Sequence, residues 1–221
     1  ASVGDAAAAD VCEFTGASAA SIKSLVKQGF LNEEVREVFR TPVLCTEPTA
    51  EDITLSPEQE NVYTGLSELM NADKPSAALL FGVTGSGKTS IYIRLAKQLM
   101  KMGKTSIVLV PEIALTPQLV GIFSSHFGDR IAVLHSSLSM GERYDEWKRI
   151  RAGKVSVVIG TRSAVFAPLE NLGMIVIDEE QEHTYKSENN PRYHARDVAK
   201  FRCVRSNAML LLGSATPSVD S

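Results

Sequence analysis

The strongest chemical signal in the sequence is a glycine-rich run that ends in a lysine and a threonine. Gly82-Val83-Thr84-Gly85-Ser86-Gly87-Lys88-Thr89 matches the phosphate-binding pattern G-x-x-x-x-G-K-[ST] at every fixed position. Glycines let the backbone curl around an anion, and the backbone N–H groups and the start of the following helix supply positive potential. Lys88 is expected to reach the outer phosphates, and Thr89 to supply a hydroxyl for Mg²⁺. The run therefore predicts a site for a nucleoside triphosphate.

A second signal is an acidic run directly after an apolar segment. Asp178 and Glu179 open this run and follow Met174–Ile177, which is apolar throughout, as is typical of a strand covered on both faces. Open α/β sheets place their ligands at the carboxyl ends of such strands. We expect Asp178 to hold Mg²⁺ through water together with Thr89, and Glu179 to orient or deprotonate the attacking water. A solvated acidic helix face is the alternative for the run alone, but its place after the phosphate-binding loop favours catalysis by Lys88, Asp178 and Glu179.

Two further segments give weaker signals. Gly213–Pro217 follows the last apolar run, and its small hydroxyl residues can hydrogen-bond to the acidic cluster; a plain turn is the alternative. Upstream, Ser56 suits the N-cap and Pro57 the first turn of a helix. Gln59 in that helix can offer its amide to an adenine edge, because donor and acceptor lie side by side in this group. A solvent-facing glutamine is the alternative.

From Ile53 onward, apolar runs alternate with segments of helical length. Almost unbroken apolar runs are typical of strands in a parallel sheet, and helices between them imply crossovers on both sides. The predicted strands are Ala77–Phe81, Ser106–Val110, Ile131–Leu134, Val155–Ile159, Met174–Ile177 and Ala208–Leu212. The predicted helices are Pro57–Met70, Ile91–Met102, Leu115–Phe127, Gly141–Arg151 and His194–Val204. The predicted fold class is therefore α/β with a mostly parallel sheet.

The chain up to about Arg40 has a different texture. Ser18 suits the N-cap of a short helix, and Gly29 suits its end. Leu31–Arg40 mixes acidic and apolar residues and is compatible with a small hairpin. A helix–turn–helix that ends in a hairpin is the pattern of a winged-helix module; a helical appendage on the main domain is the alternative. Residues 42–52, with two prolines, look like a linker.

Composition sets limits on class and location. The 221 residues are 44% hydrophobic and 22% charged, which is ordinary for a globular protein. No apolar run approaches the roughly 20 residues that span a bilayer. The alanine-rich start has no basic residue, so it does not suit a secretion signal. It also has no initiator methionine, so we expect the chain to be a piece of a longer one. Three distant cysteines indicate neither a disulfide framework nor a metal site and favour a reducing cytoplasm. The net charge of −3 requires nucleic-acid binding to come from local patches.

Taken together, the motifs in this order resemble the first motor lobe of superfamily-2 helicases, and in particular the PriA family of bacterial primosomal replication-restart helicases. The segments that carry the resemblance are Gly82–Thr89, Val110–Gln118, Gly160–Pro168, Asp178–Gln181, Tyr193–Asp197 and Gly213–Pro217. Gly16–Phe30 is similar to the end of that family's winged-helix domain. The resemblance implies a small winged-helix-like domain, or its C-terminal part, at residues 1–41, a linker at 42–52, and a RecA-like P-loop NTPase lobe at 53–221.

The resemblance also assigns roles to matching positions. The Gly82–Thr89 loop would bind the ATP phosphates and Mg²⁺, Gln59 would contact adenine, and Asp178 with Glu179 would be the hydrolysis pair. A track for single-stranded DNA would include Pro111, Glu112, Thr116, Thr161, Arg162 and Ser163. Physically, Arg162 can contact phosphate, while backbone N–H groups and hydroxyls fix the register of the strand.

Gln181–Arg196 resembles an aromatic-rich loop that links DNA engagement to hydrolysis in the family. It alternates rings with cations, as sequence-tolerant strand binders do; a solvated loop with ordinary aromatic anchors is the alternative. The candidate residues for DNA binding or coupling here and in the last motif are Gln181, His183, Tyr185, Lys186, Arg192, Tyr193, His194, Arg196, Ser214 and Thr216. Gln181 stands where the family usually has histidine. Glutamine can hydrogen-bond to the Ser214 or Thr216 region but cannot carry a proton, which puts this coupling in question.

As a whole, the resemblance implies an ATP-dependent 3′-to-5′ DNA helicase that acts at stalled or branched replication forks and helps load the replicative helicase. Its ligands would be ATP, Mg²⁺ and single-stranded or forked DNA; its partners would be single-strand-binding protein and primosome proteins, in the nucleoid-associated cytoplasm and away from membranes. The family's zinc-binding region, second lobe and 3′-DNA-end-binding domain have no counterpart in this sequence, so we expect this chain alone to bind nucleotide weakly and hydrolyse it slowly or not at all. Another superfamily-2 translocase and a nucleotide-gated interaction module without hydrolysis are the alternatives.

Overall fold

The structure, a computed structural model, describes residues 6, 8–34, 48–72, 74–83 and 85–217. Its contacts divide the chain into two compact units, Ala1–Val38 and Phe39–Ser221. The predicted domains (1–41, 42–52 and 53–221) stay predictions, because residues 35–47, where the first would meet the second, lie outside the described ranges.

The smaller unit contains two short helices, α1 (Ala8–Thr15) and α2 (Ala19–Lys27). As predicted, Ser18 caps α2, since its hydroxyl accepts the N–H of Ser21 at 3.2 Å. Gly29 follows the helix in the left-handed region, at a φ of +78°, which glycine adopts without strain. Of the predicted hairpin over Leu31–Arg40, residues 31–34 form no strand, and residues 35–40 lie outside the described ranges. The winged helix therefore stays a prediction.

The larger unit is built on one six-stranded sheet in which every pairing is parallel. The strands lie in the order β1-β6-β5-β2-β4-β3. They are β1 (Ser76–Phe81), β2 (Thr105–Leu109), β3 (Ile131–Leu134), β4 (Val157–Gly160), β5 (Leu172–Ile177) and β6 (Met209–Ser214). The α/β class and the parallel sheet are thus confirmed. All residues of β2 to β6 are buried except Thr105, which explains why these strands read as unbroken apolar runs.

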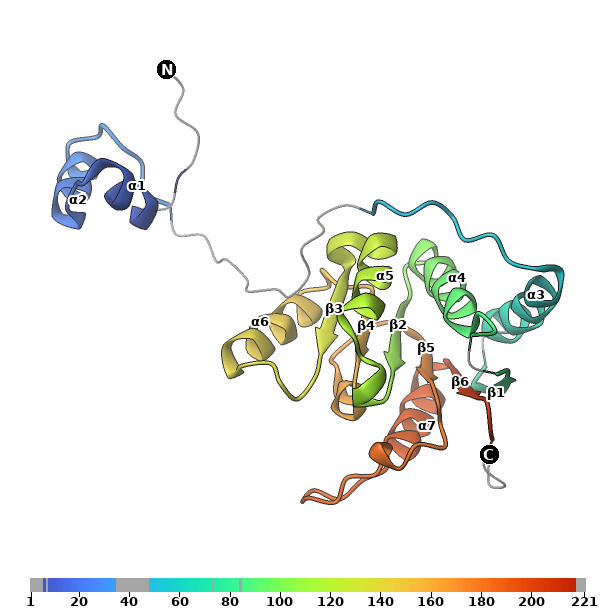
Figure 1. The fold of residues 1–221 in the computed structure, drawn as a ribbon. Coiled ribbons are helices and arrows are strands. Elements are labelled where there is room, and N and C mark those ends of the chain that lie inside the picture. The colour runs from blue at the N-terminus through green and yellow to red at the C-terminus, as the bar shows by residue number, and fades with distance from the viewer. Residues whose placement is uncertain (1–5, 7, 35–47, 73, 84, 218–221) are drawn as a thin grey trace. The chain divides into compact units, whose positions relative to one another are not determined.

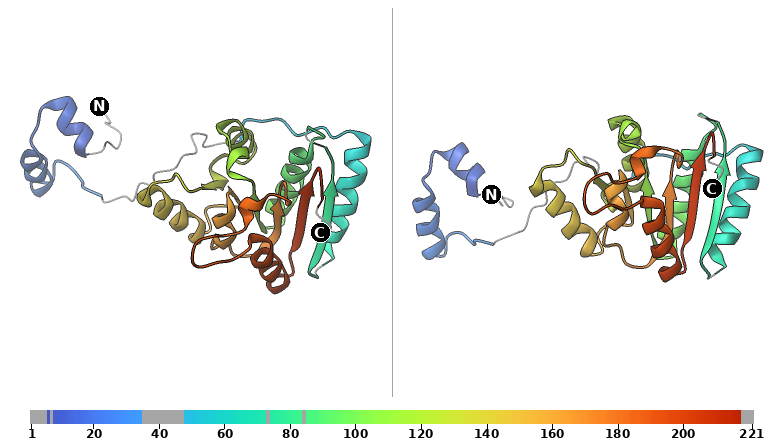
Figure 2. Two further views of the ribbon diagram at one scale, coloured as in Figure 1. Left: turned by 60° about the horizontal axis from the view of Figure 1, so that its bottom comes forward. Right: turned by 90° about the horizontal axis from the view of Figure 1, so that it is seen from below.

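Helices cover both faces of the sheet and make two separate cores (Figures 1 and 2). One face packs against α3 (Pro57–Asn71), α4 (Lys88–Lys101) and α5 (Pro117–Phe127), and the other against α6 (Met140–Arg151) and α7 (Ala195–Ser206). Side chains alternate along each strand, so β5 sends Met174 and Val176 into the first core and Ile175 and Ile177 into the second. The sheet is thereby held between two apolar layers.

Several predicted boundaries differ from the observed ones by a few residues. The helix predicted from Leu115 begins at Pro117, because the Thr116 hydroxyl caps it by accepting the N–H of Leu119 at 3.2 Å. A 3₁₀ turn, η1 (Glu112–Ala114), precedes it. The helix predicted from Ile91 already begins at Lys88, and β6 continues to Ser214, so that the start of the last motif lies inside a strand. The other 3₁₀ turns are η2 (Gly128–Arg130), η3 (Arg162–Phe166) and η4 (His183–Tyr185).

β1 forms one edge of the sheet, and β6 is its neighbour. Leu80 is buried under the helices of the first core, whereas Leu79 and Phe81, which point to the other face, are 41% and 66% exposed. Within the described ranges, no helix is both long and apolar enough to cross a membrane.

Candidate active site

The phosphate-binding loop connects β1 to α4, as its sequence predicts. Gly85 and Gly87 have φ angles of +82° and +84°, so both lie in the left-handed region that favours glycine. A Cβ atom on Gly87 would lie 2.3 Å from the side-chain nitrogen of Gln59, so a larger residue would displace that amide and would also be strained at this φ. Thr84, one of the predicted nucleotide-binding residues, lies outside the described ranges.

Gln59 lies against this loop. Its Oε1 accepts the N–H of Ser56 at 2.9 Å, which completes a capping box at the start of α3. Its Nε2 donates to the carbonyl of Ser86 at 2.9 Å. One hydrogen and one lone pair of the amide remain for an adenine edge, so the helix cap places Gln59 beside the site predicted for the nucleotide.

Lys88 joins the loop to the acidic strand end. Its Nζ donates to the carbonyl of Gly82 at 2.6 Å and lies 3.4 Å from Oε1 of Glu179. Lys88 is buried, with 8% of its surface exposed. The topology explains the meeting, because β6 alone separates β1 from β5 and all three strands are parallel. Two motifs some ninety residues apart therefore face each other at the carboxyl ends of the strands.

Asp178 is held by an aromatic side chain from α4. The hydroxyl of Tyr92, a residue that is 1% exposed, donates to Oδ1 of Asp178 at 2.9 Å. Burial raises the pKa of Asp178 above its usual range, while the Tyr92 hydrogen bond and the Lys88 charge oppose this rise and the Glu179 charge adds to it. Burial also raises the pKa of Tyr92 far above its usual value, so Tyr92 stays a hydrogen-bond donor.

Gly213 on β6 makes room for this pair. A Cβ atom at this position would lie 1.9 Å from the Tyr92 hydroxyl and 2.9 Å from Oδ1 of Asp178. Both distances are far below ordinary contact, so only glycine is compatible with the arrangement. The first residue of the last motif thus shapes the acidic site directly.

Glu179 has a donor on each carboxylate oxygen. Lys88 contacts Oε1, and Nε2 of Gln181 donates to Oε2 at 2.8 Å. Oε1 of Gln181 in turn accepts the Ser214 hydroxyl at 2.6 Å, and Ser214 accepts the N–H of Thr216 at 3.1 Å. The glutamine thus makes the hydrogen bond to the last motif that the sequence predicted. Glu179 has a φ of +47°, an unusual value for a residue other than glycine.

The loop between β5 and α7 contains a tyrosine that is buried in the structure. Tyr185 is 1% exposed, and its hydroxyl donates to the carbonyls of Asp178 at 2.6 Å and of Leu109 at 3.2 Å. The buried ring presents no face to a base in this conformation, and the role of Tyr185 in DNA binding or coupling stays a prediction. The Tyr185 hydroxyl thus lies at the carboxyl ends of β2 and β5, where the loop folds back over the sheet.

Other residues of the loop divide into inward-facing and exposed groups. His194 caps α7 by accepting the N–H of Arg196 at 3.2 Å, and Nη1 of Arg196 lies 3.3 Å from the buried carboxylate of Glu180. Tyr193 packs edge-on against Phe166, with ring centroids 4.9 Å apart. The exposed predicted residues of the loop are His183, Lys186 and Arg192.

A profile of the DEAD/DEAH box helicases matches residues 57–221. The chain belongs to the DEAD/DEAH box helicase family. It is also 48% identical over 219 residues to the replication restart protein PriA of Bacillus subtilis and 42% identical over 217 residues to PriA of Synechocystis. These matches cover 97% and 96% of this chain, but only 27% and 25% of the relatives, so the chain spans about a quarter of their length. The resemblance to the PriA family is confirmed.

A solved structure of RecG bound to a three-way DNA junction is similar to 75% of this helicase chain, with a TM-score of 0.58 and 25% identity. The match covers 21% of that chain. The helicase domain of Pyrococcus furiosus Hef shares the fold, with a TM-score of 0.51 at 22% identity. The predicted RecA-like helicase lobe is therefore confirmed as the fold of the larger unit.

Two adjoining grooves share Glu112, Ser136 and Thr161 in their linings. One, of about 550 Å³, is lined by the exposed residues Glu112, Ser163, His183 and Lys186 together with Arg162. Arg162 donates to the carbonyls of Thr184 and Lys186, so part of its guanidinium already holds the loop. The predicted track residues Pro111 and Thr161 are buried, so neither side chain presents a broad surface to a nucleic acid.

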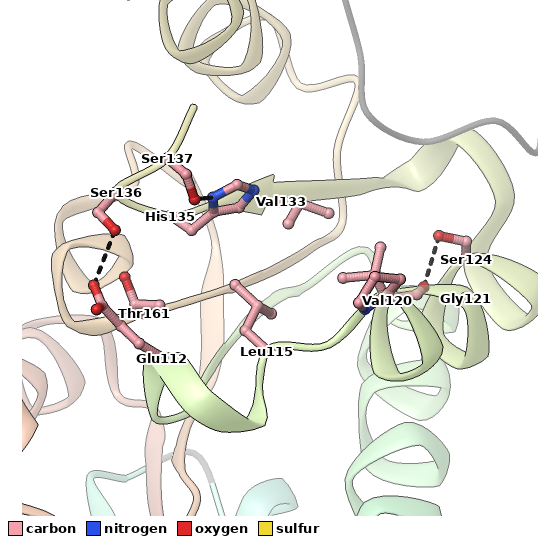
Figure 3. A pocket seen from close by; sticks show the side chains of 11 residues that line it. Glu112, Leu115, Val120, Gly121, Ser124, Val133, His135, Ser136, Ser137 and Thr161 are labelled. Carbon is pink, nitrogen blue, oxygen red and sulfur yellow. Dashed lines mark hydrogen bonds between the residues drawn. The ribbon is translucent and has the colours of Figure 1, made fainter. Parts of the chain in front are cut away.

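The second groove, of about 700 Å³, runs between η1–α5 and the end of β3 (Figure 3). Glu112 lies at its rim and accepts the Ser136 hydroxyl at 3.0 Å. His135, Ser136 and Ser137 come from the segment after β3. The sequence prediction missed this segment, although its place at the carboxyl end of a parallel strand is a signal for a ligand site.

The described residues fit a nucleotide with a divalent metal, as a DEAD/DEAH box helicase domain implies. The two left-handed glycines curl the loop, and Lys88 supplies a buried cation beside it. Asp178 is a hydrogen-bonded carboxylate whose negative charge is disfavoured by burial, so a cation beside it would be stabilising. Tyr92, which the sequence prediction missed, lies one helical turn after Lys88 and orients this carboxylate.

Proposed function

We propose that this chain is the nucleotide-binding lobe of an ATP-dependent 3′-to-5′ DNA helicase that acts at stalled or branched replication forks and helps load the replicative helicase. The observation that carries the proposal is the contact of Lys88 with both the phosphate-binding loop and Glu179. The names of the relatives, replication restart proteins PriA, support the role in restart.

ATP is the proposed nucleotide and Mg²⁺ the proposed metal. The loop from Gly82 to Thr89 would hold the phosphates, and Gln59 would contact the adenine. Thr89 and Asp178 would hold Mg²⁺, which when bound neutralises charge on the transferring phosphoryl group. Lys88 would exchange its contact with Glu179 for the outer phosphates.

Glu179 would act as the general base for water. Its carboxylate is held by Lys88 and Gln181, and the exchange of Lys88 toward phosphate would release Oε1 to accept a proton. Gln181 would keep Oε2 oriented from the side of the last motif. The hydrogen-bonded path from Glu179 through Gln181 to Ser214 is the proposed coupling route.

Single-stranded and forked DNA are the proposed macromolecular ligands. The two grooves are lined in part by the predicted track residues Glu112 and Thr161, and exposed His183, Lys186 and Arg192 would contact the strand. RecG, the structural relative, was solved on a DNA junction. Single-strand-binding protein and primosome proteins are the proposed partners. Zinc is proposed as a ligand of the longer protein. The proposed location is the cytoplasm near the nucleoid.

A nucleotide-binding titration with Mg²⁺ tests the site. Lys88→Ala removes a buried charged donor, so we expect ATP affinity to fall about 10- to 100-fold. Lys101→Ala, an exposed lysine in the last turn of the same helix, is the matched control and should bind as the parent does. Equal affinity in the Lys88→Ala chain and the parent would refute the proposed site.

A further inference from the structure

We propose that Tyr92 is a positioning residue for the metal-holding carboxylate of Asp178, and that Gly213 provides the space for their contact. This inference rests on the proposed function and extends it to two residues outside the phosphate-binding loop and the acidic run. Tyr92 would act through Asp178, to which its hydroxyl donates.

The first argument is the geometry of the hydrogen bond. The Tyr92 hydroxyl donates to Oδ1 of Asp178 at 2.9 Å from a helix position one turn after Lys88. The same short helix segment therefore carries the phosphate-binding lysine and the support of the acidic group on the neighbouring strand. A carboxylate with one oxygen fixed by a buried donor has a fixed orientation for the other oxygen.

The second argument is the burial of the donor. Tyr92 is 1% exposed, and its ring lies in the first core beside Ile91 and Leu95. A buried hydroxyl needs a partner, and Asp178 is the partner that the structure gives it. Because the ring is held by packing on all sides, the hydroxyl cannot swing away, so the orientation of Asp178 is set by a rigid helix.

The third argument is the space at Gly213. A Cβ atom there would lie 1.9 Å from the Tyr92 hydroxyl but 3.2 Å from the ring carbon that bears it, and 2.9 Å from Oδ1 of Asp178. The tightest conflict is thus with the very hydroxyl that orients Asp178. The glycine of the last motif and the tyrosine of α4 form one spatial unit around this carboxylate.

The test measures binding of a fluorescent ATP analogue to the parent chain and to Tyr92→Phe, once over a series of Mg²⁺ concentrations and once in EDTA. Loss of a hydrogen bond behind a metal-holding group typically weakens metal binding about 10- to 100-fold. We therefore expect Tyr92→Phe to need about 10- to 100-fold more Mg²⁺ for half-maximal binding, with analogue affinity in EDTA unchanged.

Tyr63→Phe is the matched control. It also removes a tyrosine hydroxyl, which lies on α3 and donates to Gln98 on α4 at 2.8 Å. It should match the parent in both titrations. Three results would each overturn the inference: an unchanged Mg²⁺ requirement in Tyr92→Phe, an equal loss of affinity for the ATP analogue in EDTA, or failure of Tyr92→Phe to fold. A parent chain whose nucleotide binding ignores Mg²⁺ would instead refute the proposed function.

A double-mutant cycle in melting temperature tests the spatial unit independently. Gly213→Ala should lower the melting temperature of the parent more than that of Tyr92→Phe, because removal of the hydroxyl relieves the closest contact. Equal losses in the two backgrounds would show that Tyr92 and Gly213 do not share this space, and would contradict the inference.

Discussion

At the residue scale, Glu179 combines two opposing donors with an uncommon backbone conformation. Lys88 and Gln181 each take one carboxylate oxygen, and the φ of +47° turns the side chain back toward the phosphate-binding loop. The neighbouring Asp178 instead continues the strand direction and faces Tyr92. Two consecutive carboxylates therefore reach different partners, which suits one for a metal and the other for a proton.

Replacement of Glu179 by Gln separates these roles. In the full-length protein we expect Glu179→Gln to keep nucleotide affinity within a few-fold and to lower ATP turnover about 10²- to 10⁴-fold, because the amide cannot accept the proton from water. Turnover and binding measured on one preparation check this. Glu182→Gln, three residues on, is the control. Unchanged biological activity in Glu179→Gln would favour the nucleotide-gated module over a motor.

At the scale of elements, α3 and α6 begin with the same capping box but lie in different places. Ser56 and Gln59 form the box of α3, and Ser139 and Glu142 form the box of α6. The box of α3 alone shares its N3 side chain with the phosphate-binding loop, through the bond to Ser86. A common helix-stabilising device is thus also a support for the loop.

The two caps predict a contrast. Ser56→Ala and Ser139→Ala should each lower the free energy of unfolding by about 1 kcal/mol, since each removes an N-cap acceptor. Ser56→Ala should in addition weaken ATP binding, because the Ser56 hydroxyl accepts the backbone N–H of Gln59, and this cap holds the residue whose side chain contacts the loop. Denaturant unfolding and nucleotide titration of both chains check this. A parallel loss of ATP binding in Ser139→Ala would show that the effect is one of global stability.

Much of this element scale could be predicted from the sequence. Unbroken apolar runs identified the strands. The rule that ligands lie at the carboxyl ends of parallel strands predicted that the phosphate-binding loop would face the acidic run, where Lys88 contacts Glu179. Tyr92 could not be identified, because a tyrosine on an apolar helix face looks like an ordinary core residue. The burial of Tyr185 could not be predicted, because the burial of a loop residue depends on which distant strand end the loop covers.

At the scale of the whole molecule, one lobe supplies only one side of the proposed nucleotide site. The resemblance to superfamily-2 helicases implies that ATP is closed between two lobes and that the second lobe would stabilise the transferring phosphoryl group. The relatives are about four times as long as the matched segment. Under the proposed function, the described residues would supply nucleotide binding and the general base, and the rest of the longer protein would supply the remaining charge stabilisation.

This division predicts a difference between the chain and the longer protein. The 221-residue chain should release phosphate slowly and without response to single-stranded DNA, whereas the full-length protein should respond strongly. Phosphate release with and without DNA checks the first part. Strand displacement by the full-length protein on forked and linear substrates then separates a helicase from a translocase that moves on duplex. Strong stimulation of the isolated chain would contradict the prediction.

The outer strand of the sheet has a practical consequence for all such measurements. β1 has β6 as its neighbour, and Leu79 and Phe81 on one of its faces are open to solvent. An extended backbone with free hydrogen-bonding groups and apolar side chains is a template for strand addition from another molecule. We therefore expect molecules of this chain to associate at high concentration. Dilute solutions are accordingly the right setting for every titration described above.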